Sequence, residues 1–220
     1  MRINEIFVSL SGELDGFGLQ GSLTTFVRLQ GCNLDCSWCD TDYAAIGDGG
    51  EDMAWETVAV QCKTNHVLIT GGEPLLQATE LVPLINNLLD NQYIITIETN
   101  GSLRPPTIAM PYKVPYLKPL RYVVDYKLPS SGMMRHMKEE VFASLTCFDV
   151  IKFVVADEED YHIAKELLLQ NPSWQARIAI SPVLTGSGLG WAQTLAQHLV
   201  DDKLEAVHFS LQLHKLLRVQ

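Results

Sequence analysis

The sequence predicts an α/β fold with a largely parallel sheet, arranged as a partial (incomplete) TIM-like barrel. Short runs of β-branched and apolar residues alternate with longer stretches of helical periodicity along the whole chain. The short runs are almost continuously apolar, which is typical of parallel strands covered on both faces. A complete eight-unit barrel needs about 250 residues, whereas this chain has 220. We therefore expect an open barrel with fewer units.

Seven segments are predicted to form strands, because each is a short run rich in β-branched or aromatic residues. In chain order these segments are Thr24–Leu29, His66–Thr70, Ile94–Glu98, Tyr122–Tyr126, Val150–Ala156, Arg177–Ser181 and Ala206–Leu211. Arg28 stands out in the first segment, since a charged side chain inside an apolar strand is costly without an acidic partner. If that partner is internal, Glu13 is a candidate.

Five longer stretches between the strands carry helical patterns. They are Trp55–Thr64, Leu76–Asn91, Met134–Leu145, Glu158–Gln170 and Gly190–Asp201. In the second, leucine and isoleucine recur at the spacing of a buried stripe, and Asn91 is the expected stop. In the fourth, Asp157 is the candidate N-cap, and Asn171-Pro172 ends the helix. The pattern resumes after the turn-rich segments at 47–50 and 104–119, so residues 1–220 are expected to form one domain.

Composition and charge restrict the classes of function. The chain has 16 Lys and Arg against 26 Asp and Glu, a formal net charge of −10, which argues against a general binder of nucleic acid or anionic membranes. No apolar run approaches the ~20 residues that span a bilayer, and the N-terminal segment lacks the apolar core of a signal peptide. We therefore expect a cytoplasmic protein, with neither nucleic acid nor a membrane as partner and with reduced thiols.

Three of the five cysteines, Cys32, Cys36 and Cys39, form a C-x₃-C-x₂-C pattern directly after the first predicted strand. Clustered thiols in a reducing compartment suggest a metal before a disulfide, and thiolates favour zinc or iron–sulfur. Because a cubane cluster normally takes four cysteines, three would leave one iron open for chemistry. The alternatives are ordinary reduced cysteines or a zinc site completed by a distant histidine. Cys62 and Cys147 are expected to be small buried hydrophobes.

The cysteine pattern, with Trp38 before the last cysteine, resembles the radical S-adenosylmethionine (SAM) superfamily. The stretches at 26–33 and 38–41 are similar to the family of 7-carboxy-7-deazaguanine synthases, and further motifs extend the similarity over nearly the whole chain. These motifs are Thr70-Gly71-Gly72-Glu73-Pro74, Glu98-Thr99-Asn100-Gly101-Ser102 and Leu211-Gln212-Leu213-His214-Lys215. The resemblance implies a radical SAM lyase that converts 6-carboxy-5,6,7,8-tetrahydropterin to 7-carboxy-7-deazaguanine with loss of ammonia, in queuosine biosynthesis.

The resemblance also implies cofactors and the residues that hold them. A [4Fe-4S] cluster would bind the catalytic Cys32, Cys36 and Cys39, and a Mg²⁺ ion would take the Thr41 hydroxyl as a ligand. The residues implied in SAM binding are Trp38, Asp40, Gly72, Glu73, Glu98, Asp125, Lys127 and Ser181. Many relatives carry Ser-Pro-Lys where this chain has Asp125-Tyr126-Lys127, so the lysine is kept and the serine is replaced.

The residues implied in substrate binding are Leu10, Ser11, Gly12, Glu13, Arg28, Thr70, His214 and Gln220. The Arg28 guanidinium matches a carboxylate bidentately, and the Glu13 carboxylate suits the two donors on the amidine-like edge of a pterin. The relatives have Gln-Gly-Glu-Gly or Gln-Gly-Glu-Ser where this chain has Ser11-Gly12-Glu13-Leu14. If these residues have no binding role, Glu98 is expected to be a solvated strand end, His214 a packed core histidine and Gln220 part of a frayed tail.

Two other functions are compatible with the three-cysteine loop. A glycyl-radical-activating enzyme shares this loop but abstracts hydrogen from a partner protein, and a non-catalytic metal-binding module would use the cysteines as structural ligands. Thr41, Glu13 and His214 favour the lyase over the activating enzyme, since they suit a closed pocket for a small molecule. As partners, the resemblance implies the pterin, an external flavodoxin-like one-electron reductant, and a second copy of the chain in a homodimer.

Overall fold

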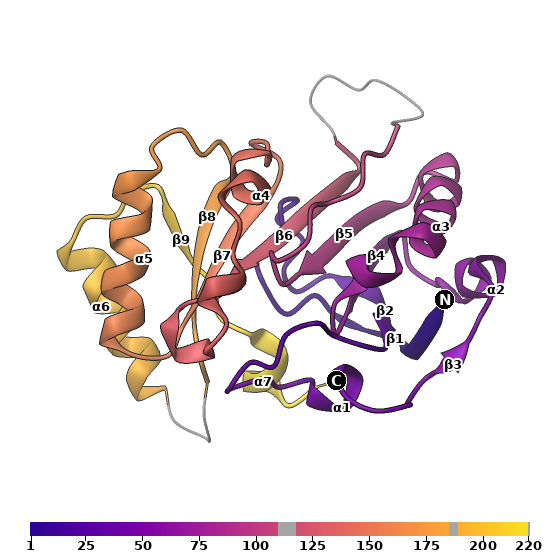
Figure 1. The fold of residues 1–220 in the computed structure, drawn as a ribbon, viewed down its shortest axis with the longest axis horizontal. Coiled ribbons are helices and arrows are strands. Elements are labelled where there is room, and N and C mark those ends of the chain that lie inside the picture. Colours follow the sequence, from indigo (N-terminus) through magenta and orange to yellow (C-terminus); the bar gives the residue numbers. More distant parts are fainter. Residues whose placement is uncertain (110–117, 185–188, 220) are drawn as a thin grey trace.

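A computed structural model gives the fold, and it describes residues 1–109, 118–184 and 189–219. Within these residues, nine strands form one sheet in the order β3-β1-β2-β4-β5-β6-β7-β8-β9 (Figure 1). The strands are β1 (Arg2–Leu10), β2 (Leu23–Leu29), β3 (Glu51–Asp52), β4 (His66–Gly71), β5 (Ile94–Thr99), β6 (Leu120–Tyr126), β7 (Val150–Val155), β8 (Arg177–Pro182) and β9 (Val207–Phe209). From β2 through β9 every neighbouring pair in this order is parallel, which confirms the predicted parallel sheet.

The helices lie beside the sheet and at one of its ends. They are α1 (Asp42–Ala45), α2 (Trp55–Gln61), α3 (Ala78–Asp90), α4 (Glu139–Ala143), α5 (Glu158–Gln170), α6 (Gly190–Asp201) and α7 (Leu213–Leu217). Figure 1 shows α2 and α3 beside the early strands, and α5 and α6 beside the late ones. The short helices α1 and α7 lie near each other at one end of the sheet.

The predicted helices at 158–170 and 190–201 have the bounds observed for α5 and α6. The side chain of Asp157 accepts a hydrogen bond from the Asp160 N–H, as expected of an N-cap. The predicted helix over 134–145 is wrong, because a 3₁₀ turn at Met134–His136 is separated from α4 by extended backbone at Met137, with φ −73° and ψ 133°. The sulfur of Met137 accepts from the Lys127 N–H at 3.2 Å, so a tertiary contact interrupts the helical pattern.

Strand β1 is absent from the sequence prediction. It pairs antiparallel with β2, with Glu5 opposite Arg28 and Leu10 opposite Leu23, and it carries β3 on its other edge. Its mixture of polar and apolar residues gives a weaker signal than the continuous apolar runs of the parallel strands. This strand therefore extends the sheet beyond the predicted parallel units.

The two faces of the sheet differ in character. Side chains such as Val27, Ile69 and Ile97 face the main apolar core, which the buried leucines of α3 complete. On the other face a smaller cluster of Val123, Val150 and Ala179 packs against Leu14 near the starts of the strands. The loop between β1 and β2 thus contributes to the inner side of the barrel.

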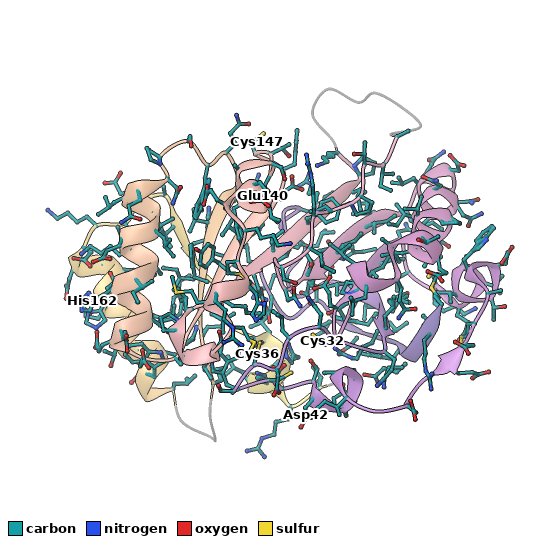
Figure 2. All side chains as sticks on the ribbon, in the orientation of Figure 1. Cys32, Cys36, Asp42, Glu140, Cys147 and His162 are labelled. Atoms are coloured by element: carbon teal, nitrogen blue, oxygen red, sulfur yellow. The ribbon has the colours of Figure 1, made fainter. Side chains whose placement is uncertain are left out.

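The two isolated cysteines have different environments. Cys62 is buried, as expected, and burial raises the pKa of its thiol to about 11. The expectation of burial is wrong for Cys147, which is exposed and lies far from Cys32 and Cys36 in Figure 2.

The described residues include no helix with the length and apolar character needed to cross a membrane.

Candidate active site

A cavity of about 200 Å³ opens at the carboxyl ends of the parallel strands. Because side chains alternate between the two faces of a strand, residues such as Phe26 and Arg28 face the cavity, while Val27 and Leu29 between and after them face the apolar core. The strand residues that line the cavity are Phe7, Phe26, Arg28, Leu68, Thr70, Gly71, Glu98, Thr99, Asp125, Lys152 and Val154. A site at this edge is the usual arrangement in parallel α/β folds.

The cysteine loop, residues 31–41, places Cys32, Cys36 and Cys39 on the wall of this cavity. It begins two residues after the end of β2, at Gly31, whose φ of 101° favours glycine. The Gly31 carbonyl accepts from the Glu73 N–H at 2.8 Å, so the loop is tied to the turn after β4. Burial raises the pKa of the Cys36 thiol, and the Lys127 ammonium opposes this effect.

The Gly71-Gly72 turn after β4 packs directly against the cysteine loop. A Cβ atom on Gly72 would lie 2.2 Å from the Gly31 carbonyl oxygen and 2.9 Å from the Cβ of Cys32. Both neighbours belong to the loop itself, and the nearer one is backbone. The close approach of the two segments therefore requires glycine at position 72.

Glu73 connects this turn to the turn after β5. Its carboxylate accepts from the Leu75 N–H at 2.9 Å, the Thr99 hydroxyl at 2.8 Å and the Asn100 N–H at 2.7 Å. Burial raises the pKa of this carboxyl, and these three donors oppose the effect. Glu73 therefore lies behind the cavity wall and holds two turns together.

Asn100 joins the same turn to the cysteine loop. Its amide nitrogen donates to Asn33 Oδ1 at 3.0 Å and approaches Cys32 Sγ at 3.7 Å. Its oxygen accepts from the N–H and the hydroxyl of Ser102. The loops after β2, β4 and β5 thus form one hydrogen-bonded unit around the thiols.

Trp38, Lys127 and Asp125 form a second part of the wall. The indole N–H of Trp38 donates to Ser130 Oγ at 2.9 Å, and Lys127 Nζ lies 5.2 Å from the centre of the ring, within range of a cation–π contact. Lys127 Nζ also lies 2.7 Å from Asp125 Oδ2. Burial opposes ionisation of Asp125, yet the ammonium groups of Lys127 and Lys152 lower the pKa of this carboxyl.

Lys152, on β7, lies among carboxylates in the cavity wall. Its Nζ is 2.5 Å from Glu13 Oε2 and 3.1 Å from Asp125 Oδ1, and Gln212 Nε2 donates to Glu13 Oε1 at 2.6 Å. Burial raises the pKa of Glu98 to about 7. The Lys152 ammonium opposes this rise, while the Glu13 and Asp125 carboxylates reinforce it.

Arg28 pairs with Glu5, whereas the sequence suggested Glu13 as an internal partner. Its Nε lies 2.8 Å from Glu5 Oε1, an oxygen that also accepts from the Tyr43 hydroxyl at 3.0 Å. Glu13 is therefore the wrong internal partner for Arg28, since it pairs with Lys152 instead. The reason is register: Glu5 stands directly opposite Arg28 in the β1–β2 ladder.

The C-terminal segment closes one side of the cavity. The Leu213 N–H donates to the Gly12 carbonyl at 2.8 Å, and a Cβ on Gly12 would lie 2.1 Å from His214 Nδ1. Lys215 Nζ lies 2.5 Å from Asp40 Oδ2. Burial lowers the pKa of His214, and the nearby Glu13 carboxylate opposes this effect. Gly12, Asp40 and His214 therefore meet at the cavity, although they are far apart in the chain.

Most residues singled out in the sequence line this cavity, including Thr41, whose hydroxyl lies 3.8 Å from Cys39 Sγ. The exceptions among the described residues are Leu10, Ser11, Glu73 and Ser181. Leu10 lies where β2 begins, because β1 runs antiparallel to it, and Ser11 and Ser181 are buried. Gln220 lies outside the described residues.

The cavity residues that the sequence did not assign include Asn100, Lys152 and Gln212. A signal for Lys152 is present, since it is a charged residue inside an apolar strand and the argument used for Arg28 applies to it equally. Asn100 and Gln212 lie within quoted motifs, but their roles depend on contacts with distant segments.

The donor chemistry of the site fits an iron–sulfur cluster. Three soft thiols on one loop face one cavity, and Cys32 and Cys39 both raise the pKa of the Cys36 thiol. Among the described residues, no three His, Cys, Asp or Glu side chains gather as they would around a single metal ion. A cluster of several irons distributes its ligands over a wider space, and three thiols around one cavity fit that donor set.

The fold and the cysteine loop together define an iron–sulfur domain with a partial-barrel fold. The family model described as a 4Fe-4S single cluster domain matches residues 14–131. The crystal structure of QueE from Escherichia coli superposes with a TM-score of 0.71, covering 97% of this chain and 94% of that chain at 24% identity. SuiB from Streptococcus suis, whose structure holds S-adenosylmethionine, superposes with a TM-score of 0.53 at 14% identity, over 85% of this chain and 47% of that chain. These likenesses show the fold.

Curated relatives narrow this class further. A 7-carboxy-7-deazaguanine synthase from Methanospirillum hungatei is 38% identical over 99% of this chain and 85% of its own length. One from Clostridium acetobutylicum is 36% identical over 98% of this chain and 95% of its own length. The chain belongs to the 7-carboxy-7-deazaguanine synthase family, and the predicted fold, enzyme class and family are confirmed.

Proposed function

We propose that the cavity is the active site at which this chain converts 6-carboxy-5,6,7,8-tetrahydropterin to 7-carboxy-7-deazaguanine with release of ammonia. The observation that carries the proposal is that three thiols share one cavity with several acidic and basic side chains. Thiols can hold a redox cofactor, and convergent charges orient a small polar substrate. Membership in the synthase family supports this choice of substrate.

Cys32, Cys36 and Cys39 would hold the [4Fe-4S] cluster. When bound, the cluster supplies the electron that cleaves SAM reductively, which is chemistry that side chains do not provide. The chain itself positions these groups. Gly72 brings backbone against the cysteine loop, and the hydrogen bonds of Glu73 hold the adjoining turns in place.

Most of the proposed SAM contacts line the cavity. The side chains concerned are Trp38, Asp40, Glu98, Asp125 and Lys127, beside the Gly72 backbone. Lys127 is held against Asp125 and over the indole of Trp38, so it is already oriented before a ligand arrives. Ser181 and Glu73 would act on SAM only from behind this wall, because neither lines the cavity.

Most of the proposed substrate contacts line the same cavity. Arg28 would bind the substrate carboxylate as a guanidinium held by Glu5, and Glu13 would accept hydrogen bonds from the amidine-like edge of the pterin. Thr70, Gly12 and His214 line the cavity near them. A Mg²⁺ ion would combine the neutral Thr41 hydroxyl with substrate oxygens and water, because magnesium accepts hard oxygen ligands and few protein groups.

The test is anaerobic turnover of 6-carboxytetrahydropterin with SAM, Mg²⁺ and a one-electron reductant, followed by mass spectrometry. The reconstituted protein should form 7-carboxy-7-deazaguanine. Cys36→Ala should abolish turnover, whereas Cys147→Ala should retain it, because Cys147 is exposed and lies outside the cavity. No product from protein with an intact cluster would refute the proposal.

The same assay distinguishes the alternatives. A glycyl-radical-activating enzyme would cleave SAM without consuming the pterin, and a zinc module would show no charge-transfer colour after reconstitution with iron and sulfide. Omitting Mg²⁺ tests the ion separately, with slower turnover expected. The flavodoxin-like reductant and the homodimer stay predictions, which electron-transfer assays and light scattering can check.

A further inference from the structure

Lys152 is a buried cation to which the proposed function assigns no role. It lies in the middle of β7, directly opposite Asp125 in the β6–β7 ladder, and its side chain is 8% exposed. Alternation along β7 places Ile151 and Phe153 in the apolar core and turns Lys152 towards the cavity. An ammonium group in such a place is costly unless several acids face it.

Three carboxylates surround this ammonium. Glu13 and Asp125 contact Nζ at 2.5 and 3.1 Å, and Glu98 is close enough for Lys152 to influence its ionisation. Asp125 has a second cation in Lys127. Among the described ion pairs, Glu13 has Lys152 as its cationic partner, while Gln212 supplies a neutral donor. Removal of Lys152 would therefore leave Glu13 and Glu98 without their compensating charge.

The proposed substrate is itself an anion at its carboxylate. Uncompensated carboxylates in a buried site repel a second anion strongly, because little water screens the interaction. Arg28, with Glu5 already at 2.8 Å, cannot offset several such charges alone. The affinity for a carboxylated ligand then depends on Lys152, the cation that lies between Glu13 and Asp125.

We propose that Lys152 is a positioning residue that sets the charge balance of the cavity and thereby its selectivity for a carboxylated pterin. This inference rests on the proposed function for the identity of the ligand. The role is indirect: Lys152 holds Glu13 and Asp125 in place and compensates their charge, and the pterin gains affinity as a consequence.

The experiment compares two probes, 6-carboxypterin and pterin without the carboxylate, in anaerobic binding titrations of the cluster-loaded protein without SAM. Lys152→Met should lower the affinity for 6-carboxypterin, relative to the affinity for pterin, by about tenfold or more. This is the effect that loss of one compensating charge in a buried site predicts. Lys152→Gln, which keeps a donor for Glu13, should show the same change. Lys165→Met is the matched control, since it removes an ion pair with Asp202 on the outer helices and should leave the ratio of affinities unchanged.

A compensating variant separates charge from packing. Lys152→Met combined with Asp125→Asn removes one acid together with the cation, which restores the net charge of the cavity and leaves Lys127 free of its ion pair with Asp125, so the ratio of affinities should return towards that of the wild type. An unchanged ratio in both single variants would overturn the inference, and so would a changed ratio that Asp125→Asn fails to restore. Wild-type protein that binds 6-carboxypterin but forms no deazaguanine would refute the proposed function alone. Wild-type protein that binds neither probe would overturn both.

Discussion

Glu98 is the carboxyl group of the cavity whose protonation state changes near neutral pH. Burial raises its pKa from 4.5 to about 7. The Lys152 ammonium opposes the rise, and the neighbouring Glu13 and Asp125 carboxylates add to it. Because an unfolded chain would hold this group at its ordinary pKa, folding and protonation of Glu98 are linked.

The sign of this linkage predicts the effect of Glu98→Gln. A raised pKa contributes stability that is fully present below pH 4.5 and is lost as the pH rises through about 7. The variant should therefore be more stable than the wild type at pH 8, by no more than about 3 kcal/mol, and the difference should shrink at pH 5. Anaerobic chemical unfolding at the two pH values measures this. Glu166→Gln, at an exposed position of α5, is the control. A pH-independent difference would contradict the prediction.

Arg28 shows what the sequence can reveal of a single residue. A charged side chain in an apolar strand requires an acidic partner, and the structure supplies one. The identity of the partner depends on the register of β1, a strand that the sequence analysis did not predict. The same argument would have identified Lys152 in β7, but its contact with Glu13 spans 139 positions and has no local signature.

At the scale of elements, the most accurate predictions rest on local signals. Helix α5 begins at a capping aspartate and ends at Asn171, and both ends follow from side-chain and backbone chemistry within a few residues. The stretch 134–145 has a helical pattern but is divided, because Met137 contacts the backbone of Lys127. Periodicity therefore predicts well that a helix exists. It does not predict whether contacts with distant residues will interrupt that helix.

The contact between the turn after β4 and the cysteine loop gives a second prediction. Gly72→Ala would place a methyl group 2.2 Å from the Gly31 carbonyl oxygen, so the cysteine loop must move. Overpacking of this kind typically lowers the free energy of unfolding by about 1–3 kcal/mol. Here it would displace the loop that carries the three thiols. We expect lower iron and sulfide content after reconstitution, with the far-ultraviolet circular dichroism preserved.

The matched control is Gly190→Ala at the start of α6, where an added Cβ meets no atom within 4 Å. That variant should reconstitute like the wild type. Full cluster content in Gly72→Ala would show that the loop tolerates the displacement, and would remove the argument that position 72 requires glycine.

For the whole molecule, the site is assembled from segments spread along the sequence. The turns after β2, β4 and β5 interlock through Glu73 and Asn100, and the C-terminal segment contacts Gly12 and Asp40. The sequence predicts the sheet that carries the site, because the strands are regular, and its motifs mark most of the cavity wall. It does not predict the ion pairs, because their partners come together only when the sheet is complete.

Ligand binding at such a site should stabilise the entire fold. SAM at about 100 times its dissociation constant stabilises the folded state by about 2.7 kcal/mol, which for a domain of this size raises Tm by roughly 5–10 °C. Thermal unfolding of the reconstituted protein with and without SAM measures the shift. Cys36→Ala should show a smaller one, because a ligand of the cluster is missing. Equal shifts in both proteins would contradict the placement of SAM beside the thiols.

The contacts between the two ends of the chain also bear on how the protein is made. A growing polypeptide releases its N-terminal part first, so the thiols leave the ribosome well before Lys215, which pairs with Asp40 of their loop. During that interval the cysteine loop lacks its C-terminal neighbours, so the cavity wall has no Lys215–Asp40 contact. Docking of the last segment then completes the wall, so the C-terminal side of the cavity is the last part to form during synthesis.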